Sequence, residues 1–179
     1  WAVRLGWDME KPAISTGKTD AIKVSFQCVD AIEISLCIEK EGLLFYESAG
    51  KRIQDPLVRD MFSRLADEER EHIQTLQEKA RFLQPAIASR NQPKERLQHF
   101  IGEELKGKIF PAGEDLSSQN IHSDKQALEL GIESEKRSVE MLQNLLEKEK
   151  KLDVKAIFLH LLVEEKKHLL MLQDLKTKL

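Results

Sequence analysis

The residues best suited to chemistry form two copies of the pattern Glu-x-x-His, Glu69 to His72 and Glu165 to His168. Side chains three residues apart on an α-helix project from the same face, so each copy can offer one ion a carboxylate and an imidazole. The copies are 96 residues apart, and the same offset relates Glu39 to Glu135. One set of metal-type ligands therefore occurs twice: Glu39, Glu69 and His72 first, then Glu135, Glu165 and His168.

Two helices with Glu-x-x-His and two helices with one Glu each form the ligand set of a carboxylate-bridged di-metal four-helix bundle. Four long segments have the apolar spacing and the terminal residues of amphipathic helices. The first covers about 29–49 and ends at Gly50, and the second covers 56–83 and begins with the cap Asp55 and with Pro56. The third covers 124–150 with Asp124 as its cap, and the fourth runs from its cap Asp153 to the C-terminus. The connection 84–123 holds one short helix, expected at about 94–105. The sequence therefore predicts an all-α fold, a four-helix bundle with one long crossover between helices 2 and 3.

The two helix pairs are also related to each other in sequence. At the offset of 96 the identical pairs include Ala31/Ala127, Glu33/Glu129, Lys40/Lys136, Phe62/Phe158, Leu65/Leu161, Glu68/Glu164, Leu76/Leu172 and Gln77/Gln173. Two copies indicate an internal duplication with pseudo-two-fold symmetry and not a solenoid. We therefore assign 29–179 to one bundle domain and 1–28 to an N-terminal segment of unassigned role, of which 21–28 are expected to extend the first helix backwards.

The candidate ligands lie in the middle of the apolar stripe of each helix. In the second helix, Phe62 and Leu76 flank Glu69 and His72 at spacings of three and four residues. The ligands should therefore face the core, whereas Glu133 falls on the solvated face of the third helix. Two chance matches in a Glu-rich protein would not be expected to share both the stripe and the offset.

Buried charge indicates what these residues hold. Burying four carboxylates together costs several kcal/mol per charge unless something cancels them. Two divalent ions carry the charge that balances four carboxylates, and neutral histidines complete their coordination. Oxygen and imidazole ligands without a thiolate favour iron or manganese, with zinc as a further alternative.

Other polar residues are expected to play lesser parts. Tyr46, two turns from Glu39, is predicted to be a core aromatic residue that hydrogen-bonds a ligand and not a redox radical site. Cys37 is read as a helix-flank residue without chemistry. His99, His122 and His160 are read as solvated or capping histidines with no metal role.

Composition excludes several classes of protein. A net charge of −3 gives no reason to expect nucleic acid or an anionic membrane as partner. The sequence contains no run of eighteen apolar residues, so no segment is expected to span a bilayer. The N-terminal residues lack a secretory signal pattern. Cys28 and Cys37 lie too far apart on a helix for a local disulfide, and no Cys-x-x-Cys occurs, which excludes a zinc ribbon or an iron–tetrathiolate centre within this chain. This cysteine usage suits a reducing cytoplasm.

The segments AIEISLCIEKEGLLFY, LADEEREHIQTL, ALELGIESEKRSVEML and LLVEEKKHLLML resemble the rubrerythrin branch of the ferritin-like superfamily, over about 31–179. The resemblance implies a ferritin-like fold, a non-haem di-iron centre that binds O₂ or peroxide, and a homodimer. It also implies that Glu69 and Glu165 bridge the two metals, that Glu39 and Glu135 are terminal carboxylates, and that His72 and His168 are terminal nitrogen ligands.

The chain departs from that family in two ways. Its two cysteines cannot build the rubredoxin domain that delivers electrons in typical members. The additional Glu that family members carry one turn from the third-helix ligand is also missing, because Ile132 and Ser138 flank Glu135 here. We therefore expect a six-ligand site that depends on an external reductase such as rubredoxin.

Three functions fit these residues. The first is a di-iron oxidoreductase that reduces hydrogen peroxide or O₂. The second is a ferroxidase that oxidises Fe²⁺ for sequestration, although no nucleation cluster of acidic residues is obvious in the sequence. The third is a helical interaction module with a relic metal site, which the intact ligands in both halves disfavour. Metal content, followed by a peroxide pulse to the iron-loaded protein, separates the three.

Overall fold

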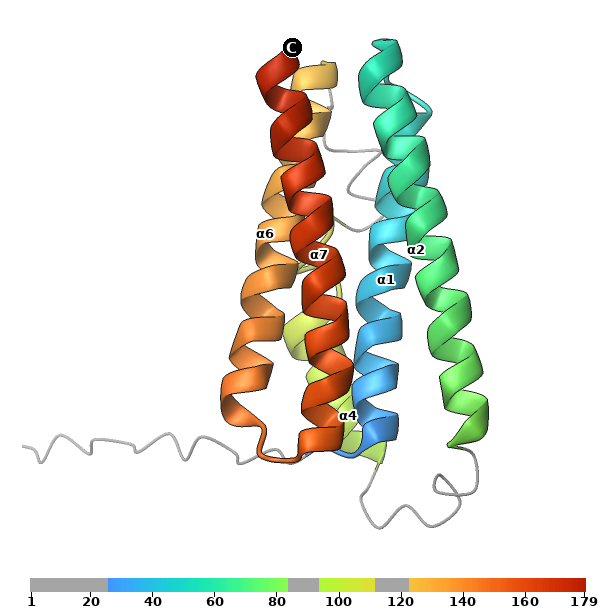
Figure 1. Ribbon diagram of the computed structural model, residues 1–179, viewed down its shortest axis with the longest axis vertical. Coiled ribbons are helices and arrows are strands. Elements are labelled where there is room, and N and C mark those ends of the chain that lie inside the picture. Colours follow the sequence, from blue (N-terminus) through green and yellow to red (C-terminus); the bar gives the residue numbers. More distant parts are fainter. Residues whose placement is uncertain (1–25, 84–93, 112–122) are drawn as a thin grey trace, which may run out of the picture.

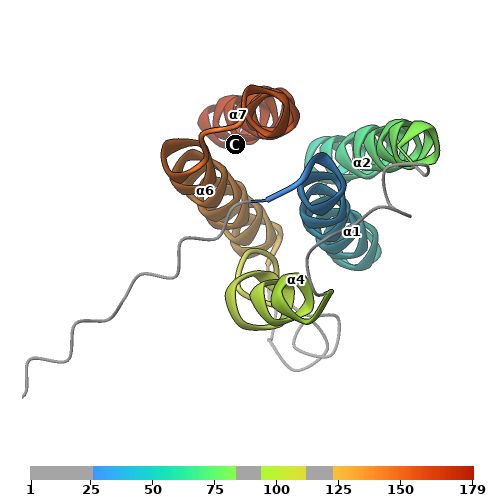
Figure 2. The same cartoon turned by 90° about the horizontal axis from the view of Figure 1, so that it is seen from below.

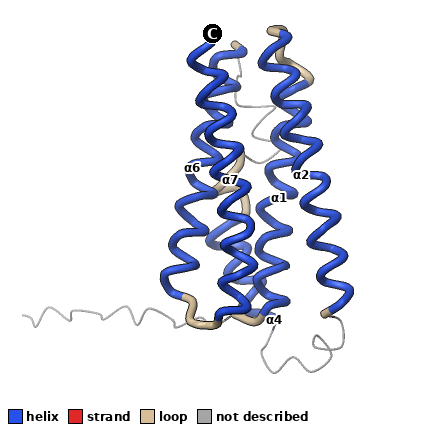
Figure 3. Tube along the Cα trace, viewed as in Figure 1, coloured by secondary structure: helices blue, strands red, loops and turns tan. Residues whose placement is uncertain are grey.

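The computed structural model describes residues 26–83, 94–111 and 123–179, and in that part of the chain every regular element is a helix. Four long helices run side by side: α1 (Cys28–Gly50), α2 (Pro56–Phe82), α6 (Asp124–Lys148) and α7 (Leu152–Lys178) (Figures 1 and 3). The short α4 (Lys94–Phe100) continues into a π-helical turn, η1 (Ile101–Leu105). The predicted all-α, ferritin-like bundle and its short helix in the connection are confirmed.

The helices are paired as the duplication predicts. Helix α1 packs along α2, and α6 packs along α7, so each half of the sequence forms one antiparallel pair (Figure 1). Seen end-on, the four helices surround a common core, and α4 lies beside α1 and α6, on the side away from α2 and α7 (Figure 2). The crossover therefore covers one side of the bundle and leaves the α2–α7 side uncovered by α4 and η1.

Two of the three predicted helix caps were wrong. Asp55 caps α2 as expected, because its side chain accepts hydrogen bonds from the backbone N–H groups of the first turn. The cap of α6 is Ser123 and not Asp124, whose carboxylate accepts instead from the backbone N–H groups of Gln54 and Asp55. Asp153 lies one residue inside α7, where an acid still interacts favourably with the helix dipole but is not the cap.

The expected backward extension of the first helix does not occur at residues 26 and 27. Gln27 has the extended backbone of an N-cap and shares a capping box with Asp30. The backbone N–H of Phe26 donates to Glu149, and Lys151 donates to the carbonyl of Phe26. These bonds hold the start of α1 against the α6–α7 turn. Residues 21–25, on which the remainder of that prediction falls, and the rest of the N-terminal segment lie outside the described residues.

The apolar stripes meet in one core. Phe45, Phe62 and Phe158 are fully buried at its centre, and Glu133 is exposed on the outer face of α6, as predicted. No helix among the described residues is long and apolar enough to cross a membrane. The same stripes that form the core carry the candidate ligands into it.

Candidate functional site

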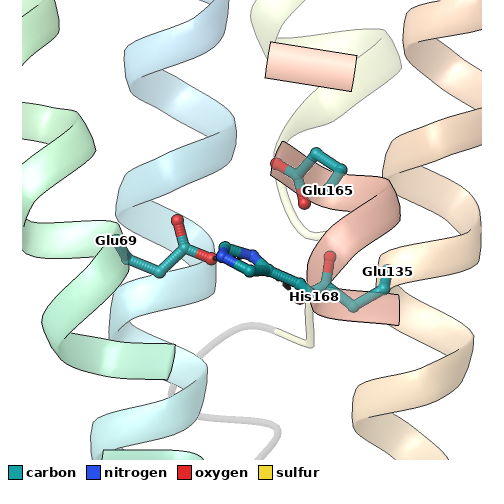
Figure 4. A group of neighbouring side chains, drawn as sticks. All are labelled: Glu69, Glu135, Glu165 and His168. Atoms are coloured by element: carbon teal, nitrogen blue, oxygen red, sulfur yellow. Dashed lines mark ion pairs between the residues drawn. The ribbon is translucent and has the colours of Figure 1, made fainter. Parts of the chain in front are cut away.

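All six candidate ligands come together halfway along the bundle. They form two overlapping groups: Glu69, Glu135, Glu165 and His168, and then Glu39, Glu69 and His72; within each group the ligand atoms lie within 4.8 Å of one another. Figure 4 shows the first group, with side chains from α2, α6 and α7 directed at a common point. Glu69 belongs to both groups, so it lies where the two groups overlap.

The two histidines turn the same nitrogen toward the carboxylates. His72 Nδ1 lies 3.3 Å from Glu39 Oε2 and 3.9 Å from Glu69 Oε2. His168 Nδ1 lies 3.4 Å from Glu69 Oε1 and 3.8 Å from Glu135 Oε1. The rings stack with their centroids 5.6 Å apart. One oxygen of Glu69 therefore faces each histidine.

The Nε2 atoms of the two histidines, which point away from the four carboxylates, face a second pair of acids. The sequence analysis did not assign these acids to the site. His72 Nε2 lies 3.7 Å from Glu164 of α7, and His168 Nε2 lies 3.5 Å from Glu68 of α2. Each histidine is therefore faced by an acid from the helix of the other half. A carboxylate on the outer nitrogen orients a metal-binding imidazole and fixes its tautomer. The signal was present in the sequence, because Glu68 and Glu164 are one of the identical pairs of the repeat.

Many polar atoms of the cluster are buried without a hydrogen-bond partner among the described residues. They are both carboxylate oxygens of Glu39 and Glu69, one oxygen each of Glu135 and Glu165, Nδ1 of His72, and both ring nitrogens of His168. Leaving a buried polar group unsatisfied costs about 1–3 kcal/mol, and more for a charged one. Orphaned oxygen and nitrogen donors that face one another fit divalent ions of the iron, manganese or zinc type.

Burial and mutual repulsion disfavour ionised carboxylates in the metal-free cluster. Burial and the neighbouring Glu69 raise the pKa of Glu39 from 4.5 to about 9. The pKa of Glu135 is raised well above its usual range, first by burial and then by Glu165. The cluster therefore retains protons at neutral pH, and metal binding must release them.

The two imidazoles differ in their electrostatic surroundings. Burial lowers the pKa of His72, but Glu39 and Glu69 outweigh it and raise the value to about 10. For His168 burial dominates, and its pKa falls below 6.5. Since the side chain of His72 is 20% exposed and that of His168 only 1%, the two halves of the cluster are not equivalent.

Tyr46 is the core aromatic residue that the sequence predicted. Its hydroxyl donates a hydrogen bond to Glu135 Oε1, and its ring packs edge-on against Phe45 and Phe62. Burial and the charge of Glu135 raise the pKa of Tyr46 well above 10, so the hydroxyl keeps its proton. Tyr46 thereby orients one carboxylate of the cluster.

Gly42 is a further residue that the sequence analysis missed. A Cβ atom there would lie 3.0 Å from Glu69 Oε1 and 3.3 Å from the ring of Phe110. The glycine lets α1 approach the central carboxylate closely. This requirement is visible only in the packing of α1 against α2. In the sequence, an isolated glycine in a helix does not indicate what lies next to it.

The other residues singled out in the sequence lie as follows. Ile132 and Ser138 are buried on either side of Glu135, so α6 brings no additional carboxylate there. Cys37 is half-buried with a free thiol, and His99 is exposed on α4. His122 lies outside the described residues. His160 is exposed and belongs to the wall of the cavity described next.

A cavity of about 250 Å³ lies between α2 and α7 and reaches the cluster from one side. Glu39 and His72 border it, whereas Glu135 and His168 do not. Its remaining walls are mostly apolar and include Leu76 and Leu161.

Comparisons with known proteins agree with this architecture. A sequence model of the rubrerythrin family matches residues 30–176. The chain is similar in fold to the crystal structure of a DUF305 fragment from Deinococcus radiodurans, with a TM-score of 0.56 and 14% identity over 84% of this chain and 97% of that one. A comparison with curated proteins found no match.

Proposed function

The chain belongs to the rubrerythrin family, and from that premise we propose that it is a non-haem di-iron oxidoreductase. It reduces hydrogen peroxide, or O₂, with electrons from an external donor such as rubredoxin. The observation that carries the proposal is the convergence of two equivalent ligand sets on one point in the bundle. A cytoplasmic homodimer is part of the same proposal.

The positions of the six residues support a division of roles. Glu69 has one oxygen toward each histidine, which suits a carboxylate that bridges two ions. Glu165 is its equivalent in the second half, and we assign it the second bridging role on the ground of the repeat, since its carboxylate belongs only to the group of Glu69, Glu135 and His168. Glu39 and Glu135 would hold the ions as terminal carboxylates, and His72 and His168 would hold them through Nδ1, the nitrogen that faces the carboxylates. Two iron ions bound there supply the redox chemistry.

The protein's own contribution is orientation, charge balance and exclusion of water. Tyr46 holds Glu135 by a hydrogen bond, and Glu68 and Glu164 face the outer nitrogens of the two histidines. The buried carboxylates lie in an environment from which water is largely excluded, so their interaction with a cation is stronger than in solution. A rigid and dry ligand set favours fast reaction with a small oxidant over side reactions.

On this proposal, electrons come from an external donor. With only two cysteines the chain cannot form a four-thiolate iron centre of its own. The reduced protein should therefore react once with peroxide and then stop. Continued turnover requires a donor protein or a small electron carrier.

Oxidation and handling of Fe²⁺ is the second candidate function. It is favoured by the cavity between α2 and α7, whose wall includes the acid Glu164 and which leads to Glu39 and His72. A carboxylate in the wall attracts a cation, and Lys79 in the same wall opposes that attraction. On this alternative Fe²⁺ is the substrate as well as the resident metal.

One experiment separates these functions. The metal-free protein is loaded anaerobically with two equivalents of Fe²⁺ per chain, mixed with excess hydrogen peroxide, and followed by optical spectroscopy. We expect one rapid oxidation, which reduced rubredoxin restarts at a rate that depends on donor concentration. Uptake of added Fe²⁺ with O₂ well beyond two equivalents, with ferric mineral, would favour iron handling. If an occupied diferrous site reacts with neither oxidant, an interaction module becomes the better interpretation.

A further inference from the structure

The cavity between α2 and α7 meets only the first half of the duplicated cluster. It borders Glu39 and His72, and the side chain of His72 is 20% exposed. The equivalent residues of the second half, Glu135 and His168, do not border it, and the side chain of His168 is only 1% exposed. A pseudo-symmetric protein therefore has one open half and one closed half, and the residues at equivalent positions explain why.

An ion-pair network closes the second half. Lys167 of α7 lies 2.7 Å from Glu68 of α2, and Arg64 lies 2.9 Å from the same acid. At the offset of 96 residues, the positions of Lys167 and Arg64 are occupied by Glu71 and His160. The open half thus has an acid where the closed half has the lysine that joins α2 to α7.

The residues one and two helical turns further along α7 and α2 also make the second half more closed than the first. In the closed half, Met171 packs against the core and Leu175 is buried. Their equivalents in the open half are Thr75 and Lys79, which are exposed and line the cavity. A short polar residue and a charged residue replace two apolar ones, so the space that the closed half fills stays accessible.

We propose that divalent metal ions enter and leave the centre through this cavity, so that the ion held by Glu39 and His72 exchanges faster than the ion held by Glu135 and His168. Glu164 in the cavity wall and Glu39 at the inner end give a cation two successive carboxylates to interact with. Lys79 opposes this attraction from the α2 side of the opening. In the closed half Glu68, the equivalent of Glu164, lies 2.7 Å from Lys167 and 2.9 Å from Arg64. Lys167 also lies 3.5 Å from Glu164, so it contacts the acid of the open half less closely.

The inference rests on the proposed di-metal centre and is tested without enzyme activity. Protein loaded anaerobically with two equivalents of Fe²⁺ is mixed in a stopped-flow instrument with an excess of a chromogenic Fe²⁺ chelator. We expect release in two phases of equal amplitude, one ion per chain in each. A single phase for both ions would overturn the inference and leave the proposed di-metal centre intact, whereas failure to bind two ions would overturn both.

Two reciprocal substitutions exchange the residues that distinguish the halves. Glu71→Lys gives the open half the lysine of the closed half, and should slow the fast phase by roughly 1.4-fold to fivefold, the range that one exposed ion pair supports. Lys167→Glu removes the close pair with Glu68 and the longer contact with Glu164, and should accelerate the slow phase. Glu140→Lys, an equal change of charge at an exposed position on α6 away from the cavity, should alter neither phase. A fast phase that is unchanged in Glu71→Lys, or slowed equally in Glu140→Lys, would overturn the inference.

Discussion

The metal-free protein should lose stability as the pH rises from 7 to 8.5. The cause is Glu39, whose pKa burial and Glu69 raise from 4.5 to about 9. In the unfolded chain this carboxyl has lost its proton well below pH 7, whereas the folded metal-free protein keeps it until about pH 9. Because the folded state then binds the extra proton, each step to higher pH favours unfolding.

The size of the effect follows from one proton. Linkage gives a loss of about 1.4 kcal/mol of unfolding free energy per pH unit for each proton that only the folded state retains. Over the 1.5 units between pH 7 and 8.5 the loss is therefore about 2 kcal/mol for Glu39 alone. His72 is not counted as a second retained proton, because the charge of Glu39 that raises its pKa is absent while Glu39 keeps its proton. His168 adds nothing in this window, since its lowered pKa affects stability only below 6.5.

Urea unfolding of the chelator-treated protein, followed by circular dichroism at several pH values, measures the loss. Glu39→Gln cannot release a proton, so its stability should fall less steeply, by about 1.4 kcal/mol per pH unit. In the metal-loaded protein bound ions have displaced the protons and stabilise the folded state by mass action. The difference in melting temperature between the loaded and metal-free proteins should therefore widen from pH 7 to 8.5. A metal-free protein whose stability is constant or rises over this window would refute the argument from buried carboxylates.

Two further substitutions test individual roles in the cluster. Glu69→Ala should abolish binding of both ions, since Glu69 faces both histidines, whereas His72→Ala should weaken mainly one; metal analysis after dialysis distinguishes these outcomes, and two ions retained in Glu69→Ala would exclude the bridging role. Tyr46→Phe keeps the aromatic packing but removes the hydrogen bond to Glu135, and should lower the unfolding free energy by about 1–3 kcal/mol in urea titrations, with no loss meaning that the bond contributes nothing.

Most of the bundle and the cluster could be predicted because both depend on helical periodicity. Residues at spacings of three and four share a helix face, so Glu69 and His72 could be placed among the apolar residues of α2 without knowledge of its neighbours. The duplication then extended the argument to the second half. It was harder to predict which of two neighbouring polar residues caps a helix. Ser123 is the N-cap of α6, while the carboxylate of Asp124 accepts hydrogen bonds from the turn before α2.

Contacts between helices could not be predicted from the sequence, because they depend on how each helix is rotated about its axis relative to its neighbour. Glu68 and Glu164 look like surface acids on their own helices, and only the crossing of α2 and α7 places each beside the histidine of the other half. Gly42 likewise gains its meaning from the carboxylate of Glu69, which comes from a different helix.

A duplicated chain starts with two equivalent halves, and the structure indicates which residues have kept that equivalence. The six ligand positions and the acids facing the histidines are the same in both halves, as expected if each half holds one ion of the proposed pair. The positions around them are not held to this requirement, and there the halves differ: Lys167 corresponds to Glu71, and Met171 corresponds to Thr75. A symmetric site enclosed on both sides would hold its ions but exchange them slowly. Here the two ligand sets are equivalent, but the residues that cover them are not. Such a centre can be stable and still be accessible from one side.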